Sequence, residues 1–301
     1  MKMRVLTTTL HPGGAPLLDL IATHAYVQLD DFEKRSLASR TSKNPWSLGA
    51  KNRTADAKIT LPEAACLLIL FQSSRGKHLK HFVDMHRPTL LRLFPRLPSY
   101  SRLVHWASKA EAFLLDFAIS GLAEPGDRKS VYLIDSTKID PHKLKSNPKC
   151  LKAKTGLGHT HEGLFIGYKL HVVSNRQGRI VAFDLSTGNR HDLDPVKGGL
   201  MRGLSGVAFG DSGYCSAQVR QDLKAQDLAL IAKPTSQMAD QLWVFDKVWR
   251  REYRQRQVVE GVFSQLKRFH GLLAESVRSA ASLRSRIDAS IAAFNLSKQA
   301  S

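Results

Sequence analysis

Three carboxylates in the second half of the chain are the side chains best suited to chemistry. Asp135 and Asp211 each follow a short apolar run, in Leu-Ile-Asp-Ser and Phe-Gly-Asp-Ser, and Glu260 is flanked by apolar residues in Val-Val-Glu-Gly-Val-Phe. Divalent cations such as Mg²⁺ and Mn²⁺ prefer oxygen ligands, and two ions about 4 Å apart need several converging carboxylates. Such a pair supports in-line displacement at phosphorus. Taken singly, each aspartate is equally typical of a turn cap, and Glu260 of a surface ion pair with Arg256.

The charge of the chain indicates a polyanionic substrate. The 45 Lys and Arg outnumber the 26 Asp and Glu, which gives a formal net charge of +19, and the excess is spread along the chain. A distributed positive surface favours nucleic acid, held through its phosphates, over the alternative of anionic lipid. The sequence also lacks a nucleophilic Ser or Cys motif. Carboxylate-bound metal and a basic surface together predict phosphodiester chemistry on nucleic acid.

Cysteine usage and hydropathy predict a soluble cytoplasmic protein. Cys66, Cys150 and Cys215 form no CxxC pair and no Cys/His zinc spacing, and an odd number of cysteines without an apolar leader suits a reducing compartment. No apolar run approaches the roughly 18 residues that a membrane-spanning helix needs. We therefore expect no membrane partner.

The elements that would position the carboxylates lie beyond residue 125. The segment Gly121–Arg128 contains Gly, Pro and Asp, which is typical of a domain boundary. After it, strands are predicted at 130–134, 164–174, 179–185, 206–210 and 228–232, and helices at 194–204, 216–225 and 253–267. This order predicts an α/β fold, a mixed sheet flanked by helices. Asp135 and Asp211 would stand at strand ends, where open α/β sheets bind ligands.

The predicted helix over 253–267 is amphipathic and carries the third carboxylate. At about 100° per residue, its apolar side chains occupy one arc, and four functional side chains form a narrow stripe beside that arc. The apolar set is Val258, Val259, Val262, Phe263, Leu266 and Phe269, and the stripe is Tyr253, Arg256, Glu260 and Lys267.

The first 125 residues are predicted to form an all-α domain, and residues 126–301 the second domain. Helices are expected at 17–37, 61–72, 77–85, 88–94 and 100–119, and Thr60 and Glu63 form a capping-box start. Basic side chains among these helices favour a helix-turn-helix-like DNA-binding module, with a plain helical bundle as the alternative. A last amphipathic helix, containing Leu283, Ile287, Ile291 and Phe294, is predicted to cover the sheet.

The spacing of the stripe resembles a family signature. Tyr253, Arg256, Glu260 and Lys267 reproduce the Tyr-Arg-Glu-Lys signature of DDE insertion-sequence transposases, and Leu-Ile-Asp135-Ser-Thr, Thr187-Gly-Asn-Arg-His191-Asp192 and Gly210-Asp211-Ser-Gly-Tyr214 look like other blocks of that superfamily. Over about residues 60–298 the chain is similar to the insertion-sequence family numbered nine hundred and eighty-two. The resemblance implies a ribonuclease-H-like fold and a metal-binding triad of Asp135, Asp211 and Glu260 with two Mg²⁺ or Mn²⁺ ions. It also implies cutting and joining of DNA at terminal inverted repeats, in a homodimer or higher oligomer, in a bacterial cytoplasm.

The remaining candidates are expected to contact DNA or to frame the site. Arg256 and Lys267 would bind phosphates, and Tyr253 would pack on the DNA backbone. The basic segment 138–154, with Lys138, Lys143 and Lys145, is interpreted as an arm that orders on DNA, or alternatively as a solvated loop. His191 and Asp192 are candidates for the rim of the metal site, although His191 is equally typical of a turn cap. Two other functions stay open: a ribonuclease-H-like nuclease without a joining step, and an inactive DNA-binding derivative.

Overall fold

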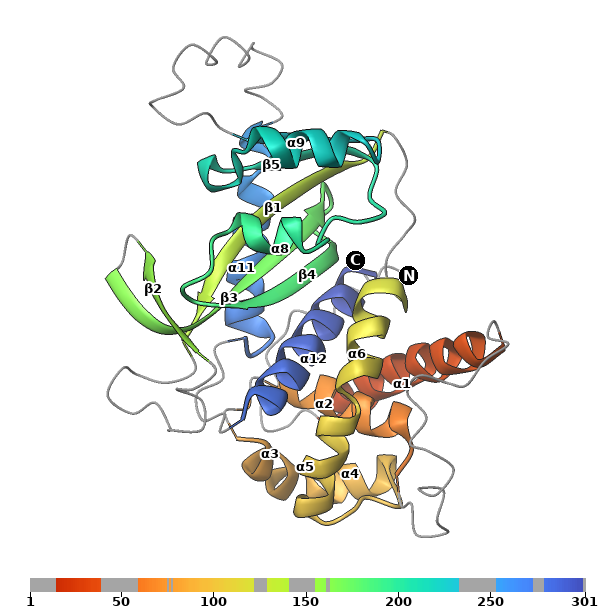
Figure 1. Cartoon of the computed structure of the whole chain (residues 1–301). Coiled ribbons are helices and arrows are strands. Elements are labelled where there is room, and N and C mark those ends of the chain that lie inside the picture. The colour runs from red at the N-terminus through yellow and green to blue at the C-terminus, as the bar shows by residue number, and fades with distance from the viewer. Residues whose placement is uncertain are drawn as a thin grey trace. The chain divides into compact units, whose positions relative to one another are not determined.

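The computed structural model describes residues 15–38, 59–74, 76, 78–121, 129–140, 155–160, 163–232, 253–272 and 279–299 (Figure 1). The chain divides into two compact units: Ala123–Gln265, here called the sheet unit, and Met1–Leu122 together with Leu266–Ser301, here called the helical unit. Within the described part of the chain, no helix has the length and apolar character needed to span a bilayer.

The sheet unit contains a mixed sheet, as the sequence predicts. Its strands are β1 (Val131–Ile139), β2 (Gly156–Thr160), β3 (Gly163–Asn175), β4 (Ile180–Thr187), β5 (Gly206–Gly210) and β6 (Leu228–Ala232). The long strand β3 pairs antiparallel with β1, β2 and β4, whereas β5 pairs parallel with both β1 and β6. Strand β2 was not predicted, because two of its five residues, Gly156 and Gly158, are glycines, which are depleted in strands.

Helices cover both faces of this sheet. Helices α8 (Leu193–Lys197) and α9 (Ala217–Lys224) lie in front of it in Figure 1, and α11 (Gln257–Phe269) lies behind it. The core on the α8–α9 side includes Tyr132, Ile134 and Val173 from the strands. Helix α8 is shorter than the predicted 194–204, because Gly199 and Gly203 adopt positive φ angles, which end a helix.

The helical unit confirms the predicted helix-rich N-terminal region. It contains α1 (Ala15–Ala38), α2 (Leu61–Ser73), α3 (Leu79–Met85), α4 (Arg87–Leu93), α5 (Tyr100–Lys109), α6 (Glu111–Asp116), the π-helical turn η2 (Phe117–Gly121) and α12 (Ala280–Gln299). The predicted capping box is present, because Thr60 Oγ1 accepts from the Glu63 amide and the Glu63 carboxylate accepts from the Thr60 amide. The segment predicted as one helix over 100–119 breaks at Ala110 and ends in η2.

The C-terminal helix packs within the helical unit. It contacts α2, α5, α6 and η2, and Asn295 Nδ2 donates to the Ala118 carbonyl at 3.1 Å, whereas the sequence predicted packing on the sheet. Every residue from 287 to 296 is buried. A helix buried on all sides needs neighbours all round, and a single apolar stripe in the sequence does not indicate which neighbours they are. Leu266–Ser301 thus belongs to the same compact unit as the N-terminal helices, whereas the sequence predicted it in the second domain.

Candidate active site

Asp135 and Asp211 lie at the same level on neighbouring parallel strands. In the β1–β5 ladder Leu133 pairs with Phe209, and each aspartate stands two residues further along its own chain. Parallel strands lie about 4.8 Å apart, so this register brings the backbones of the two aspartates close together.

Asp135 is not at the end of its strand, contrary to the sequence prediction. Strand β5 ends at Gly210, but β1 continues to Ile139, because β3 supplies a partner on its other edge and Asp135 pairs with Val172 there. The backbone of Asp135 is therefore held by the ladder, at the point where β1 loses its parallel neighbour.

The Asp135 carboxylate is mostly buried and bonded on both oxygens. Oδ1 accepts from the Ser136 amide at 2.8 Å, and Oδ2 forms an ion pair with Arg256 Nη2 at 3.2 Å. Burial raises the pKa of Asp135 to about 6, although Arg256 and the Ser136 amide oppose the rise. The charges of Asp211 and Glu260 add to it, so both carboxylates lie within electrostatic reach of Asp135.

Asp211 begins the turn η3 (Ser212–Tyr214), and Gly213 leaves room beside it. The Asp211 Oδ1 atom accepts from the Gly213 amide at 2.9 Å. A Cβ atom at position 213 would lie 3.0 Å from Asp211 Oδ1 and 3.4 Å from Asp192 Oδ2. The carboxylates of Asp211 and Asp192 therefore both border the space that this glycine leaves open. Tyr214 is buried below them, and its burial, with the charges of Asp192, Asp135 and Asp211, raises its pKa well above the ordinary value.

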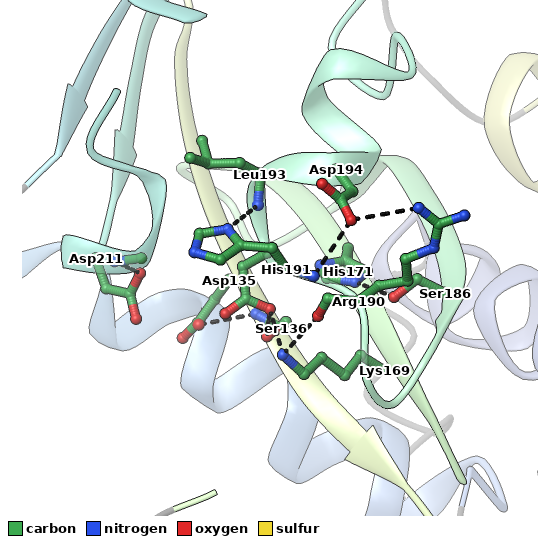
Figure 2. A network of polar contacts seen from close by, with 12 residues as sticks. Asp135, Ser136, Lys169, His171, Ser186, Arg190, His191, Leu193, Asp194 and Asp211 are labelled. Atoms are coloured by element: carbon green, nitrogen blue, oxygen red, sulfur yellow. Dashed lines mark hydrogen bonds and ion pairs between the residues drawn. The ribbon is translucent and has the colours of Figure 1, made fainter. Parts of the chain in front are cut away.

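Asp192 belongs to a polar network that reaches the residue after Asp135 (Figure 2). Its Oδ1 accepts from Ser136 Oγ at 3.2 Å and pairs with Lys169 Nζ at 3.1 Å. Lys169 also donates to the Arg190 carbonyl at 3.1 Å. Ser136 and Lys169 were missed by the sequence analysis, since only strand register brings them to Asp192.

His191 caps the turn into α8. Its Nδ1 accepts from the Leu193 amide at 3.2 Å, and its own amide donates to Asp194 Oδ2 at 3.3 Å (Figure 2). Because Nδ1 is an acceptor here, the neutral ring carries its proton on Nε2. These two bonds agree with the alternative interpretation of His191 as a turn cap.

The four residues of the stripe do not lie on one continuous helix. Helix α11 begins at Gln257. Arg256 lies in the turn just before it, and its amide donates at 3.0 Å to the carbonyl of Tyr253, which is helical. This turn directs Arg256 to Asp135, and Arg256 Nη1 also donates to the Tyr253 hydroxyl at 3.1 Å. Glu260 is exposed in the first turn of α11, and Lys267 lies in the last turn, about 10 Å further along the helix axis.

The carboxylates of Asp135, Asp211 and Glu260 suit a hard divalent cation, but in this structure they do not converge on one point. Among the residues that the structure describes, no three Asp, Glu, His or Cys side chains converge closely enough to hold a metal ion. Carboxylate oxygens are nevertheless the ligands that Mg²⁺ and Mn²⁺ prefer, and Asp135 at present holds a guanidinium cation instead. Lys138 lies on β1 three residues beyond Asp135, whereas Lys143 and Lys145 lie outside the described residues.

Comparison with known proteins identifies the family. Residues 125–279 match the family model described as the transposase DDE domain. No curated protein sequence matches the chain. The matched segment covers just over half of the chain, includes all six strands, and contains Asp135, Asp211 and Glu260. The chain therefore belongs to the transposase family that this DDE domain defines.

Proposed function

We propose that the protein is a DNA transposase that cleaves a DNA strand at terminal inverted repeats and transfers the freed end to target DNA. Asp135, Asp211 and Glu260 would hold two Mg²⁺ or Mn²⁺ ions. The observation that carries this proposal is the β1–β5 register, which sets two aspartates side by side while the charge of Glu260 reaches Asp135. The spacing of Tyr253, Arg256, Glu260 and Lys267, and the similarity to the insertion-sequence family numbered nine hundred and eighty-two, support the same function.

The chemistry of the bound ions would be to activate the attacking oxygen and to stabilise the leaving one. The protein must present ionised carboxylates for this purpose. Because the pKa of Asp135 is about 6, its carboxylate is mostly ionised at pH 7. Arg256 helps to keep Asp135 ionised. Its guanidinium lies beside Oδ2, where a metal ion bound to that oxygen would lie. With metal bound at Asp135, the Arg256 guanidinium would instead be available to a DNA phosphate.

The polar network behind β1 would fix the orientation of the two aspartates. Ser136 donates its amide to Asp135 and its hydroxyl to Asp192, and Lys169 balances the Asp192 charge. Asp192 also borders Gly213, whose amide holds Asp211. We assign Asp192 to positioning rather than to metal binding, since its Oδ1 is already shared by Ser136 and Lys169.

Basic side chains around the carboxylates would hold the DNA. The net charge of +19 favours binding through phosphates, and membership of a transposase family implies DNA as the partner. We assign DNA contacts to Tyr253, Arg256, Lys267 and Lys138, and to Lys143 and Lys145 in the segment outside the described residues. Assembly of at least two chains would bring both element ends together.

The test is a Mg²⁺-dependent cleavage and joining assay on DNA that carries the sequences flanking the reading frame. Wild-type protein should cut at the element ends and give strand-transfer products. Glu260→Gln should lose cleavage by at least a hundredfold while binding the same DNA, and Asp222→Asn, an exposed carboxylate on α9, serves as the matched control. Cleavage without joined products would indicate the nuclease alternative. Wild-type protein that binds the ends but never cuts would indicate the inactive derivative, and undiminished cleavage by Glu260→Gln would remove this residue from the triad.

A further inference from the structure

The helical unit contains a cavity of about 960 Å³ that the sequence analysis did not anticipate. Its lining comes from α2, α3, α5 and the start of α12, and all of its lining residues belong to this one unit. Leu68 and Phe71 of α2 form an apolar wall, and both are buried. Tyr100, 39% exposed, lies at the start of α5.

Cationic and hydroxyl side chains dominate the polar part of the lining. Lys80 on α3 and Arg286 on α12 contribute two positive charges, with His78 and His81 beside them, and Asp84 is the one acidic residue among the described lining residues. Because the two cations Lys80 and Arg286 outnumber Asp84, this lining has a net positive charge.

Arg286 is held in a fixed position against the wall. Its guanidinium carbon lies 4.9 Å from the centre of the Phe71 ring, which is the geometry of a cation–π contact. A guanidinium stacked in this way loses little conformational freedom when it binds an anion, and its planar fork of donors matches phosphate oxygens.

The first turns of α12 add donors on the same side. The cavity is lined by Ser279 and Ser282 at the start of this 20-residue helix, and Ser279 Oγ accepts from the Ser282 amide at 3.2 Å. Hydroxyl groups and a helix N-terminus both favour an anion. The charged lining, which includes the stacked arginine, and the hydroxyl-lined helix start therefore both favour an anionic ligand.

We propose that this cavity binds a phosphate of the DNA backbone, with Arg286 and Lys80 as its two cationic contacts and Tyr100 against the adjoining sugar or base. The inference rests on the proposed transposase function, because DNA is the polyanion that this function supplies. It assigns a second DNA contact to the helical unit, apart from the carboxylates of the sheet unit. Such a contact would fix the position of the DNA without reading its sequence.

The salt dependence of DNA binding by the full-length protein tests this proposal. The probes are a fluorescent duplex from the element end and a random-sequence duplex of equal length, titrated between 50 and 200 mM salt. Each lost phosphate contact should reduce the slope of log K against log salt by about 0.9, which corresponds to roughly eightfold weaker binding at 0.1 M. Lys80→Gln and Arg286→Gln should each show this loss on both duplexes, because a phosphate contact is independent of sequence.

Arg102→Gln is the matched control. Arg102 is exposed on α5, like Tyr100, but does not line the cavity. Its slope should stay that of the wild type. Equal losses in all three variants would overturn the cavity as a phosphate site, and so would unchanged slopes for Lys80→Gln and Arg286→Gln. Unchanged slopes are also the result expected if the cavity binds an acidic peptide.

Two measurements keep this result separate from other failures. Thermal unfolding checks that Arg286→Gln folds, and if it does not, exposed Lys80 carries the test. Metal-dependent cleavage by the wild-type protein reports on the proposed function itself. If cleavage occurs and the slopes do not change, only the cavity inference fails, whereas a wild-type chain that binds neither duplex removes the function on which it rests.

Discussion

Replacing Asp135 by Asn should stabilise the metal-free protein at neutral pH, although it destroys the proposed active site. Asp135 has a pKa of about 6 in the folded protein, against an ordinary value of 3.8. The unfolded chain therefore releases this proton at a lower pH than the folded chain does. The native state loses stability, relative to the unfolded state, as the pH rises from about 4 to about 6, and the loss is complete above pH 6. Asn has no such proton to lose.

The size of the effect follows from the two pKa values. A tenfold change in an ionisation constant corresponds to about 1.4 kcal/mol, so ionised Asp135 lowers the free energy of unfolding by about 3 kcal/mol at pH 7. The side chain is only 18% exposed, so solvent screens little of this effect. Below pH 4 both chains carry a neutral side chain that still accepts from Ser136, and the difference between them should approach zero.

Urea unfolding of both proteins in EDTA, followed by circular dichroism at pH 4, 5, 6, 7 and 8, measures this difference. Subtracting the wild-type free energy from that of Asp135→Asn cancels the other titrating groups, and Asp222→Asn is the exposed control. Mg²⁺ at a hundred times its Kd should then stabilise the wild type and Asp222→Asn, but not Asp135→Asn, by about 2.7 kcal/mol. A difference that does not change with pH, or a variant less stable than the wild type at pH 7, would refute the reasoning about the buried carboxylate.

Two further predictions concern positions next to the site and far from it. Gly213→Ala should slow metal-dependent cleavage by tenfold to a hundredfold with little change in stability, because the new Cβ would lie 3.0 Å from Asp211 Oδ1 and displace that carboxylate. The control is Gly261→Ala, where a Cβ meets no atom within 4 Å. Equal cleavage rates for the two variants would contradict the prediction. Thr60→Ala should lower the free energy of unfolding by about 1 kcal/mol, because it removes the capping box at α2. Thr60→Ser keeps a hydroxyl and should retain most of that stability. Equal urea unfolding curves for the two variants would show that the cap contributes nothing.

Local sequence signals predicted the parts of the fold that depend on local interactions. The apolar runs located β1, β3, β4, β5 and β6, and Asn175 to Gly178 forms the predicted turn, with Gly178 at a φ of 76°. The capping box at Thr60 was predicted in atomic detail, because both of its bonds join residues three apart. None of these features needs knowledge of a distant partner.

Several of the features that were wrong or missing depend on distant partners. Strand β1 continues past Asp135 because β3 happens to be 13 residues long and pairs with it as far as Ile139. Residues 287–296 of α12 are all buried, so their sequence resembles that of many core helices. It gives no indication that α2 and α6 are the neighbours of this helix. The turn before α11 breaks the expected helix, because the Arg256 guanidinium reaches Asp135, which is 121 residues away in the sequence.

The unequal lengths of β1 and β5 give the two aspartates different surroundings although they follow paired residues of neighbouring strands. Asp135 is held in the β1–β3 ladder, and its buried carboxylate forms an ion pair with Arg256. Asp211 follows the last residue of β5 and begins a turn, in which its carboxylate accepts from the amide of Gly213. In the proposed function, Asp135 would therefore be the ligand whose backbone is fixed by the sheet, and Asp211 the ligand presented by a turn. Glu260, exposed in the first turn of α11, would supply the third carboxylate.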